Sequence, residues 1–177
     1  MTISIDGITR VEKLLVEDDR GRFEKFFSGF ENFESPNLVW RESFSSVSVK
    51  DTIRGLHLQA PPFDHYRLVS CVEGAINDVC VDLRLGSPSY LGIHSEPLDS
   101  SSGYSLLIPP GVAHGFVGLS GPARVIYFST ATYSHAKESG VRWSSIDFDW
   151  GIRHPVVSPR DQSLPPISEF ESPFRFR

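Results

Sequence analysis

Five side chains that can take part in chemistry lie in otherwise apolar stretches of the sequence: Arg54, His57, Arg67, His114 and Tyr127. Near pH 7 a histidine can be neutral and can accept a proton. An arginine can stabilise the oxyanion that forms when a proton leaves the carbon beside a carbonyl. A tyrosine on the opposite side can return the proton. If strands of a barrel bring these side chains into one cavity, the set suits proton transfer next to a carbonyl.

The residues from Ile53 to Gln59 are the stretch around which the sequence is organised, and they predict a β-strand. Because side chains alternate along a strand, Arg54 is expected on one side and Gly55 and His57 on the other. Gly55 would let another backbone approach closely. A histidine in such a strand is more often a surface or core residue than a catalytic base. Whether His57 is a base or a surface or core residue therefore depends on motifs elsewhere in the chain.

A metal site is an alternative use of the histidines. Many small β-barrels hold a metal with a His-x-His pair that is followed by Glu and His. This sequence has His57-Leu58-Gln59 at the corresponding place, so the second histidine is missing. His65 and His114 could add ligands, but the set remains incomplete. The sequence therefore favours a site without a metal.

The elements that must position these residues are short strands separated by glycine and proline turns. Such a pattern predicts an all-β fold, a sandwich or barrel of which the jelly roll is one form, with few short helices. One helical turn is expected over residues 134–138. All 177 residues are expected to form a single domain, with a less ordered C-terminal tail from about residue 164. Strands are predicted at residues 11–16, 22–27, 43–49, 53–59, 66–72, 75–83, 91–98, 104–108, 112–119 and 123–130.

Two acidic side chains, Asp78 and Asp82, share one face of the predicted strand at residues 75–83. Acids on a dry face would be unusual, so a solvated face is the simpler interpretation. The two cysteines, Cys71 and Cys80, also lie in apolar runs. They are expected to be buried free thiols in a reducing compartment.

Composition and charge narrow the classes of function. A hydrophobic content of 40% and a charged content of 22% are ordinary for a soluble globular protein. The net charge of −5 argues against nucleic-acid binding, but not against a small phosphorylated ligand held by a few arginines. No apolar run is long enough to cross a membrane, and the N-terminus lacks the features of a secretory signal. These features predict a cytoplasmic protein that binds neither nucleic acid nor membrane.

Three longer motifs follow one another along the chain. They read Arg-Gly-Leu-His-Leu-Gln at residues 54–59, Val-Cys-Val-Asp-Leu-Arg at residues 79–84 with Ser-Pro at 87–88, and Ile-Pro-Pro-Gly-Val-Ala-His-Gly-Phe at residues 108–116. Shorter matches are Asp-Arg-Gly at residues 19–21, Tyr127, and Gly-Val-Arg-Trp at residues 140–143. In this order and spacing the motifs resemble the dTDP-4-dehydrorhamnose 3,5-epimerase family over residues 10–165.

The resemblance implies a cupin-type jelly roll that acts as a homodimer. It also implies a nucleotide-diphosphate-linked 4-keto-6-deoxy sugar as the substrate, in deoxy-sugar or polysaccharide biosynthesis. Such enzymes invert C3, C5 or both, the carbons next to the ketone, without a metal or an organic cofactor. This chemistry agrees with the residues themselves, since hydrogens beside a ketone are those that a modest base can remove.

The resemblance also assigns roles to residues of this chain. His57 matches the base, Asp161 its dyad partner, and Tyr127 the acid that reprotonates the opposite face. The remaining matches are to substrate-binding positions. These are Arg54 at the diphosphate, His114 at the substrate, Arg20 reaching the nucleotide across the dimer, and Glu138 at the nucleotide.

Several positions depart from the family pattern. Arg67 replaces the usual lysine near the sugar, and an arginine is bulkier, planar and a poorer proton donor. Glu42 and Phe44 replace a glutamine and an asparagine that help to hold the nucleotide, while Arg160 replaces a frequent lysine. Since the dyad and the tyrosine are kept, we expect an altered substrate or an altered site of epimerisation rather than lost catalysis.

Three other functions remain open from the sequence. The first is a related isomerase or single-site epimerase of an unusual deoxy-sugar pathway. The second is a catalytically idle protein of the same fold that binds a sugar nucleotide. The third is a metal-dependent cupin.

Overall fold

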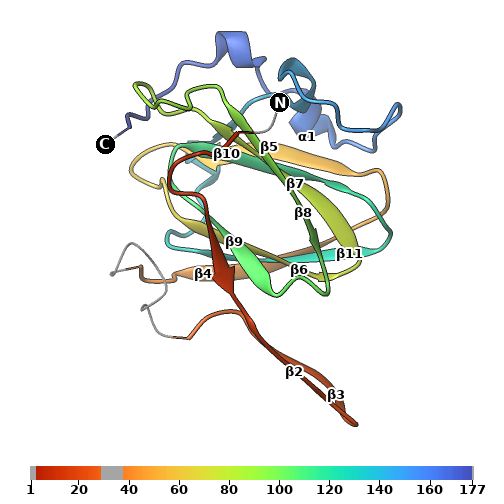
Figure 1. Ribbon diagram of the computed structural model, residues 1–177. Helices are drawn as coiled ribbons and strands as arrows, with labels where there is room; N and C mark the ends of the chain where they lie inside the picture. Colours follow the sequence, from red (N-terminus) through yellow and green to blue (C-terminus); the bar gives the residue numbers. More distant parts are fainter. Residues whose placement is uncertain (1–2, 29–37, 177) are drawn as a thin grey trace.

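Two antiparallel β-sheets stacked face to face form the body of the computed structural model, which describes residues 3–28 and 38–176 (Figure 1). In strand order, the first sheet consists of β1 (Thr9–Glu12), β9 (Tyr104–Ile108), β6 (Arg67–Glu73), β11 (Ala123–Ser129) and β4 (Glu42–Ser48). The second consists of β12 (Glu138–Gly140), β5 (Ile53–Gln59), β10 (Val112–Gly118), β7 (Ala75–Asp82) and β8 (Ile93–Asp99). The all-β prediction is confirmed, and the predicted strands from residue 43 onward are all present with small shifts at their ends.

Helical structure among the described residues is confined to short pieces. They are the four-residue helix α1 (Pro159–Gln162) and three 3₁₀ turns at His135–Lys137, Trp143–Ser145 and Ile167–Glu169. The first of these turns lies where the sequence predicts one. No helix in the described parts of the chain has the length and apolar character needed to cross a membrane.

The N-terminal region differs from the prediction of one strand at residues 11–16. β1 ends at Glu12, and β2 (Leu14–Asp18) begins two residues later to pair with β3 (Gly21–Lys25) in a separate hairpin. The chain divides there because β1 pairs with β9 in the first sheet, whereas β2 and β3 pair only with each other. The hairpin projects away from the body (Figure 1).

The apolar side chains form three clusters, the smallest of which includes Val11, Leu68 and Leu107 of the first sheet. Residues such as Val69, Ile76 and Phe116 fill the space between the sheets. Val79, Val81 and other residues of the second sheet point outward, where the C-terminal segment covers them. Burial on both faces explains why β7 and β10 read as nearly continuous apolar runs. Each fully buried aliphatic side chain contributes about 1.5–3 kcal/mol.

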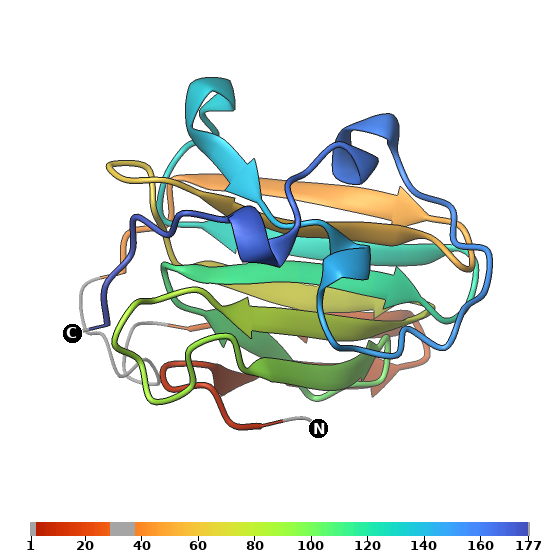
Figure 2. The ribbon, with the colours of Figure 1, turned by 90° about the horizontal axis from the view of Figure 1, so that it is seen from above.

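The C-terminal segment crosses the outer face of the second sheet (Figure 2). Trp150 and Phe174 are buried there, and the backbone N–H of Leu85 donates to the carbonyl of Phe174. The N–H of Phe176 donates back to the carbonyl of Leu85. The tail after residue 164, for which the sequence predicts less order, is therefore extended but docked, because it completes an apolar layer.

An extra residue in β5 changes which way its side chains point. β10 pairs His114 with His57 and Phe116 with Arg54, so β5 advances three residues while β10 advances two. This is a β-bulge, and it shifts the alternation of side chains by one position. Arg54 and His57 consequently line the same pocket, so the expectation that they lie on opposite sides was wrong.

Gly55 is the residue that the bulge requires. Its φ angle is +106°, and a Cβ atom there would lie 2.6 Å from the carbonyl oxygen of His114. Both the backbone conformation and the contact exclude a larger side chain.

We expect Gly55→Ala to destabilise the fold by about 1–3 kcal/mol, because the new methyl group meets the β10 backbone. Chemical denaturation of the purified variant measures this loss. Gly103→Ala is the matched control, since a Cβ atom at position 103 would meet no heavy atom within 4 Å and the φ angle there lies outside the left-handed region. Equal stability of the two variants would contradict the role assigned to Gly55.

Phe174→Ala should lower the free energy of unfolding by about 3 kcal/mol or more, as expected for a buried aromatic side chain. Phe174 is only 5% exposed. Leu119, which is 47% exposed, serves as the control, and Leu119→Ala should cost less than about 0.5 kcal/mol. A loss below about 1 kcal/mol for Phe174→Ala would mean that the tail does not pack as described.

Candidate active site

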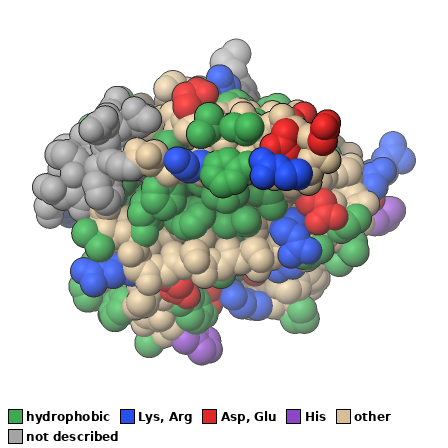
Figure 3. Space-filling view, turned by 90° about the horizontal axis from the view of Figure 1, so that it is seen from below, with side chains coloured by type: hydrophobic (Ala, Val, Ile, Leu, Met, Phe, Trp, Pro, Cys, Tyr) green, Lys and Arg blue, Asp and Glu red, His purple; other side chains and the backbone are tan. Residues whose placement is uncertain are grey.

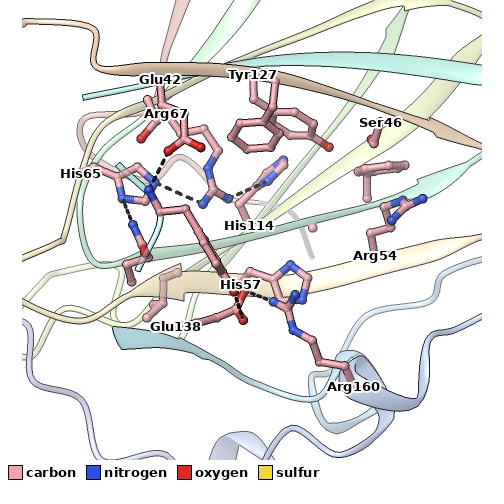
Figure 4. Close-up of a pocket in the computed structure, with 17 residues that line it drawn as sticks. Glu42, Ser46, Arg54, His57, His65, Arg67, His114, Tyr127, Glu138 and Arg160 are labelled. Carbon is pink, nitrogen blue, oxygen red and sulfur yellow. Dashed lines mark hydrogen bonds and ion pairs between the residues drawn. The ribbon is translucent and has the colours of Figure 1, made fainter. Parts of the chain in front are cut away.

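A cavity of about 240 Å³ opens between the two sheets (Figure 4). It collects most of the residues singled out in the sequence, and they come from both sheets and from the C-terminal segment. Its lining is mixed, with charged groups at the mouth and aromatic rings along one wall. The lining residues are Glu42, Phe44, Ser46, Arg54, His57, Leu58, Gln59, His65, Arg67, His114, Gly115, Phe116, Tyr127, Ser129, Tyr133, Glu138 and Arg160.

His57, on β5, forms a hydrogen-bonded pair with Asp161 of α1. The His57 Nε2 atom lies 2.7 Å from the Asp161 Oδ1 atom. Because the carboxylate can only accept, Nε2 carries the proton and donates it to Asp161. The Nδ1 atom is then left with its lone pair. The predicted His57–Asp161 pair is thus formed, although the two residues lie 104 positions apart in sequence.

Asp161 is buried and held by three contacts. Its Oδ2 accepts a hydrogen bond from the Gly55 N–H at 3.1 Å, and its own N–H donates to the N-cap hydroxyl of Ser158. Burial acts to raise the pKa of Asp161, but the hydrogen bond and charge of His57 and the Gly55 N–H outweigh burial and lower it. Asp161 therefore remains ionised and orients the ring of His57.

Tyr127 faces the pocket from β11, in the sheet opposite to that of His57 (Figure 4). It is 6% exposed, and burial raises its pKa to about 12. The ring of Phe44, its cross-strand neighbour on β4, stacks on it with centroids 4.7 Å apart. Tyr127 thus keeps its proton at neutral pH and has little freedom to turn.

His114 lies on β10, next to His57, and is buried. Its Nε2 atom is 2.6 Å from the Oδ2 atom of Asp78, a fully buried carboxylate on β7. Asp82 is also fully buried, and it accepts hydrogen bonds from the Arg84 side chain. The solvated face expected for the two acids was wrong, because each carboxylate has a partner that compensates its burial.

Two arginines enter the pocket in different settings. Arg54 lies at the exposed rim, where Nε donates to the Ser48 hydroxyl at 2.9 Å. The Arg67 side chain lies deeper, between His65 and His114, and burial lowers its pKa. The pocket therefore holds positive charge both at its mouth and at its base.

A chain of polar contacts closes the other side of the mouth. The N–H of Tyr133 donates to Glu42 at 2.6 Å, and the Tyr133 hydroxyl donates to Glu138 at 2.8 Å. Arg160 forms an ion pair with Glu138. The sequence did not single out Tyr133, since an exposed tyrosine in a polar loop carries no distinctive signal.

Arg20 does not reach this pocket. It lies at the turn of the β2–β3 hairpin, is exposed, and forms an ion pair with Asp18. Its predicted contact with a nucleotide is therefore not formed within a single chain.

Further pocket residues were not assigned to the site from the sequence. Ser46, Gln59 and Ser129 line the pocket from β4, β5 and β11. Small polar residues are common on strands, so only their position in the fold reveals them. Asp78 is recognisable in the sequence as an acid within an apolar strand. Its partner His114 lies 36 residues away, so the sequence does not show that the two side chains meet.

The histidines considered as metal ligands have other partners. His65 and His114 both face Arg67. Within residues 3–28 and 38–176, no group of three or more His, Cys, Asp or Glu side chains is arranged to hold a metal ion.

Asp161→Asn should lower the free energy of unfolding at pH 7 by about 1–2 kcal/mol, because the Gly55 N–H loses a charged acceptor. A carboxylate with a lowered pKa stabilises the fold fully above its unfolded pKa of about 4, and the gain is lost as the pH falls further. The difference between wild type and variant should thus shrink below about pH 4 in urea titrations.

The exposed Asp147 provides the control, and Asp147→Asn should change stability by less than about 0.5 kcal/mol. A difference between wild type and Asp161→Asn that stays constant down to about pH 2 would show that the charge of Asp161 does not stabilise the fold.

Known proteins resemble this chain in both sequence and structure. Residues 2–169 match the dTDP-4-dehydrorhamnose 3,5-epimerase family. The chain is 36% identical over 161 residues to a dTDP-4-dehydrorhamnose 3,5-epimerase of Shigella flexneri, covering 89% of each chain. It is 33% identical over 171 residues to a dTDP-4-dehydrorhamnose 3-epimerase of Streptomyces niveus, covering 94% of this chain and 83% of the relative.

A solved structure shows the same fold. It is a 3,5-epimerase from Legionella pneumophila in complex with dTDP-4-keto-L-rhamnose, with a TM-score of 0.90 and 28% identity. The match covers 100% of this chain and 97% of that one. The predicted cupin-type fold is thereby confirmed. The chain therefore belongs to the dTDP-4-dehydrorhamnose 3,5-epimerase family of isomerases.

Proposed function

We propose that the protein epimerises a nucleotide-diphosphate-linked 4-keto-6-deoxy sugar at C3, C5 or both, in deoxy-sugar biosynthesis. The observation that carries the proposal is the placement of His57 and Tyr127 on opposite sheets across one pocket. Inversion of a carbon needs a base on one face and an acid on the other. The family membership and the names of the relatives support the same reaction.

In the proposed reaction, His57 Nδ1 removes the proton from a carbon next to the C4 ketone. The electrons of the C–H bond form the C=C bond of an enolate, and the negative charge moves to the ketone oxygen. Asp161 stabilises the resulting imidazolium, because its carboxylate accepts the Nε2 proton in a hydrogen bond. Tyr127 then delivers its hydroxyl proton to the opposite face of the same carbon, which inverts it.

The cationic groups are proposed to hold the rest of the substrate. The Arg67 guanidinium, deep in the pocket, stabilises the enolate oxygen, and His114 binds the sugar beside it. Arg54 at the rim binds the diphosphate. Glu42, Glu138 and Arg160 lie at the mouth, where the nucleotide would lie.

We further propose a homodimer in which Arg20 reaches the nucleotide of the partner. The hairpin that carries Arg20 exposes Leu14, Val16 and Phe23, and hydrophobic side chains gather on the face seen in Figure 3. Exposed apolar side chains of this kind favour burial against another chain. A reducing compartment, such as the cytoplasm, suits the two free cysteines, which are buried as expected.

Incubation in D₂O with a dTDP-linked 4-keto-6-deoxyhexose tests the function. We expect deuterium at C3, C5 or both, read by NMR of the sugar. His57→Ala should abolish incorporation, whereas Tyr127→Phe should slow inversion by about 10²-fold or more while sparing exchange, because it removes only the returning proton.

The exposed His154 is the control, and His154→Asn should exchange as the wild type does. The UDP, CDP and GDP forms of the sugar are tested in parallel. No exchange with any of the nucleotide forms, or full exchange by His57→Ala, would contradict the proposal.

A further inference from the structure

Within the described parts of the chain, no carboxylate contacts Arg67 directly, and the nearby Asp78 carboxylate is bonded to His114 instead. Among the residues that the structure describes, none of the ion pairs includes Arg67. Its Nε atom is buried and has no hydrogen-bond partner within residues 3–28 and 38–176. A buried cation without a counter-ion is costly, so its surroundings must hold it by other means.

Two imidazole rings hold the guanidinium group (Figure 4). The Nη2 atom of Arg67 lies 3.2 Å from His65 Nε2, and its Nη1 atom lies 3.5 Å from His114 Nδ1. A guanidinium only donates, so the ring nitrogen that faces it must present a lone pair.

The opposite nitrogen of each ring has a partner that sets this tautomer. His65 Nδ1 lies 3.0 Å from the carbonyl oxygen of Phe63, which can only accept, and 3.3 Å from the Gln59 amide nitrogen, which can only donate. Because Nε2 must accept from Arg67, Nδ1 carries the proton and donates to Phe63, while the Gln59 amide has carbonyl acceptors of its own. His114 Nε2 lies 2.6 Å from the Asp78 carboxylate and carries the proton there. In both rings the nitrogen that faces Arg67 is therefore the acceptor.

The electrostatics of His65 agree with this geometry. Burial, followed by the charge of Arg67, lowers the pKa of His65 to about 4. The ring is therefore neutral at physiological pH and keeps its lone pair.

We propose that His65 is a positioning residue that holds the Arg67 guanidinium in place without neutralising its charge. A carboxylate in the same place would bind the guanidinium more tightly, but it would cancel the charge that a substrate oxygen needs. A neutral imidazole supplies the hydrogen bond alone. This inference rests on the proposed epimerase function, in which Arg67 faces the enolate oxygen, and it adds a residue from outside the recognised motifs.

Steady-state kinetics of His65→Leu and His65→Gln test the inference. His65→Leu removes the acceptor, and we expect kcat to fall about tenfold or more with little change in KM, because Arg67 then loses its alignment with the transition state. His65→Gln places an amide oxygen near the Nε2 position and should restore most of kcat. His154→Asn, an exposed histidine outside the pocket lining, should match the wild type.

A double-mutant cycle shows whether His65 acts through Arg67. In an Arg67→Met background, His65→Leu should lower the residual rate of deuterium exchange by less than about twofold. Full additivity of the two changes would overturn the proposal, as would a Gln variant that is as slow as the Leu variant while both remain folded by thermal melting.

Nitrogen-15 NMR of the free protein gives a readout that needs no substrate and no variant of His65. We expect the wild type to show the Nδ1-protonated tautomer of His65, and its Nε2 resonance should shift in Arg67→Met. A His65 ring protonated at Nε2 would overturn the proposal even if the enzyme is active. A wild-type protein that shows this tautomer but exchanges no deuterium would instead contradict the proposed function.

Discussion

The contact between Gly55 and the backbone of β10 is the constraint on which the site depends. The bulge that it permits places one extra residue in β5, so that Arg54 and His57 point into the same cavity. The same turn of the chain directs the Gly55 N–H at the Asp161 carboxylate. One backbone irregularity thereby positions the candidate base, its carboxylate partner and a candidate phosphate ligand.

Three buried carboxylates of the described chain share one arrangement, and the buried cation Arg67 has a different one. Asp78, Asp82 and Asp161 each receive a hydrogen bond from a histidine or an arginine, which compensates the loss of water. Among the described residues, Arg67 has no carboxylate in direct contact, and two histidine rings hold it instead. The positive charge of the Arg67 guanidinium is thus available to stabilise an oxyanion that develops in the pocket.

The two stacked aromatic side chains of the pocket lie on the first sheet, opposite the sheet that carries His57. Tyr127 and Phe44 face each other across β11 and β4 and stack closely, so the tyrosine hydroxyl is fixed on the side opposite His57. The second sheet supplies the base, and the first supplies the acid. A two-sheet sandwich is therefore well suited to a reaction that uses both faces of one carbon.

The sequence by itself determined most of the strands, the all-β class and the identity of most pocket residues, because these depend on local alternation, turn residues and motifs. It could not reveal the bulge at Gly55, the burial of Asp78 and Asp82, the docking of Phe174 or the contact of His65 with Arg67. Each of these depends on pairing between distant segments, such as His114 with Asp78 or Leu85 with Phe174. Only the tertiary structure decides such pairs, since the energy of a buried charge is set by its neighbours in space rather than in sequence.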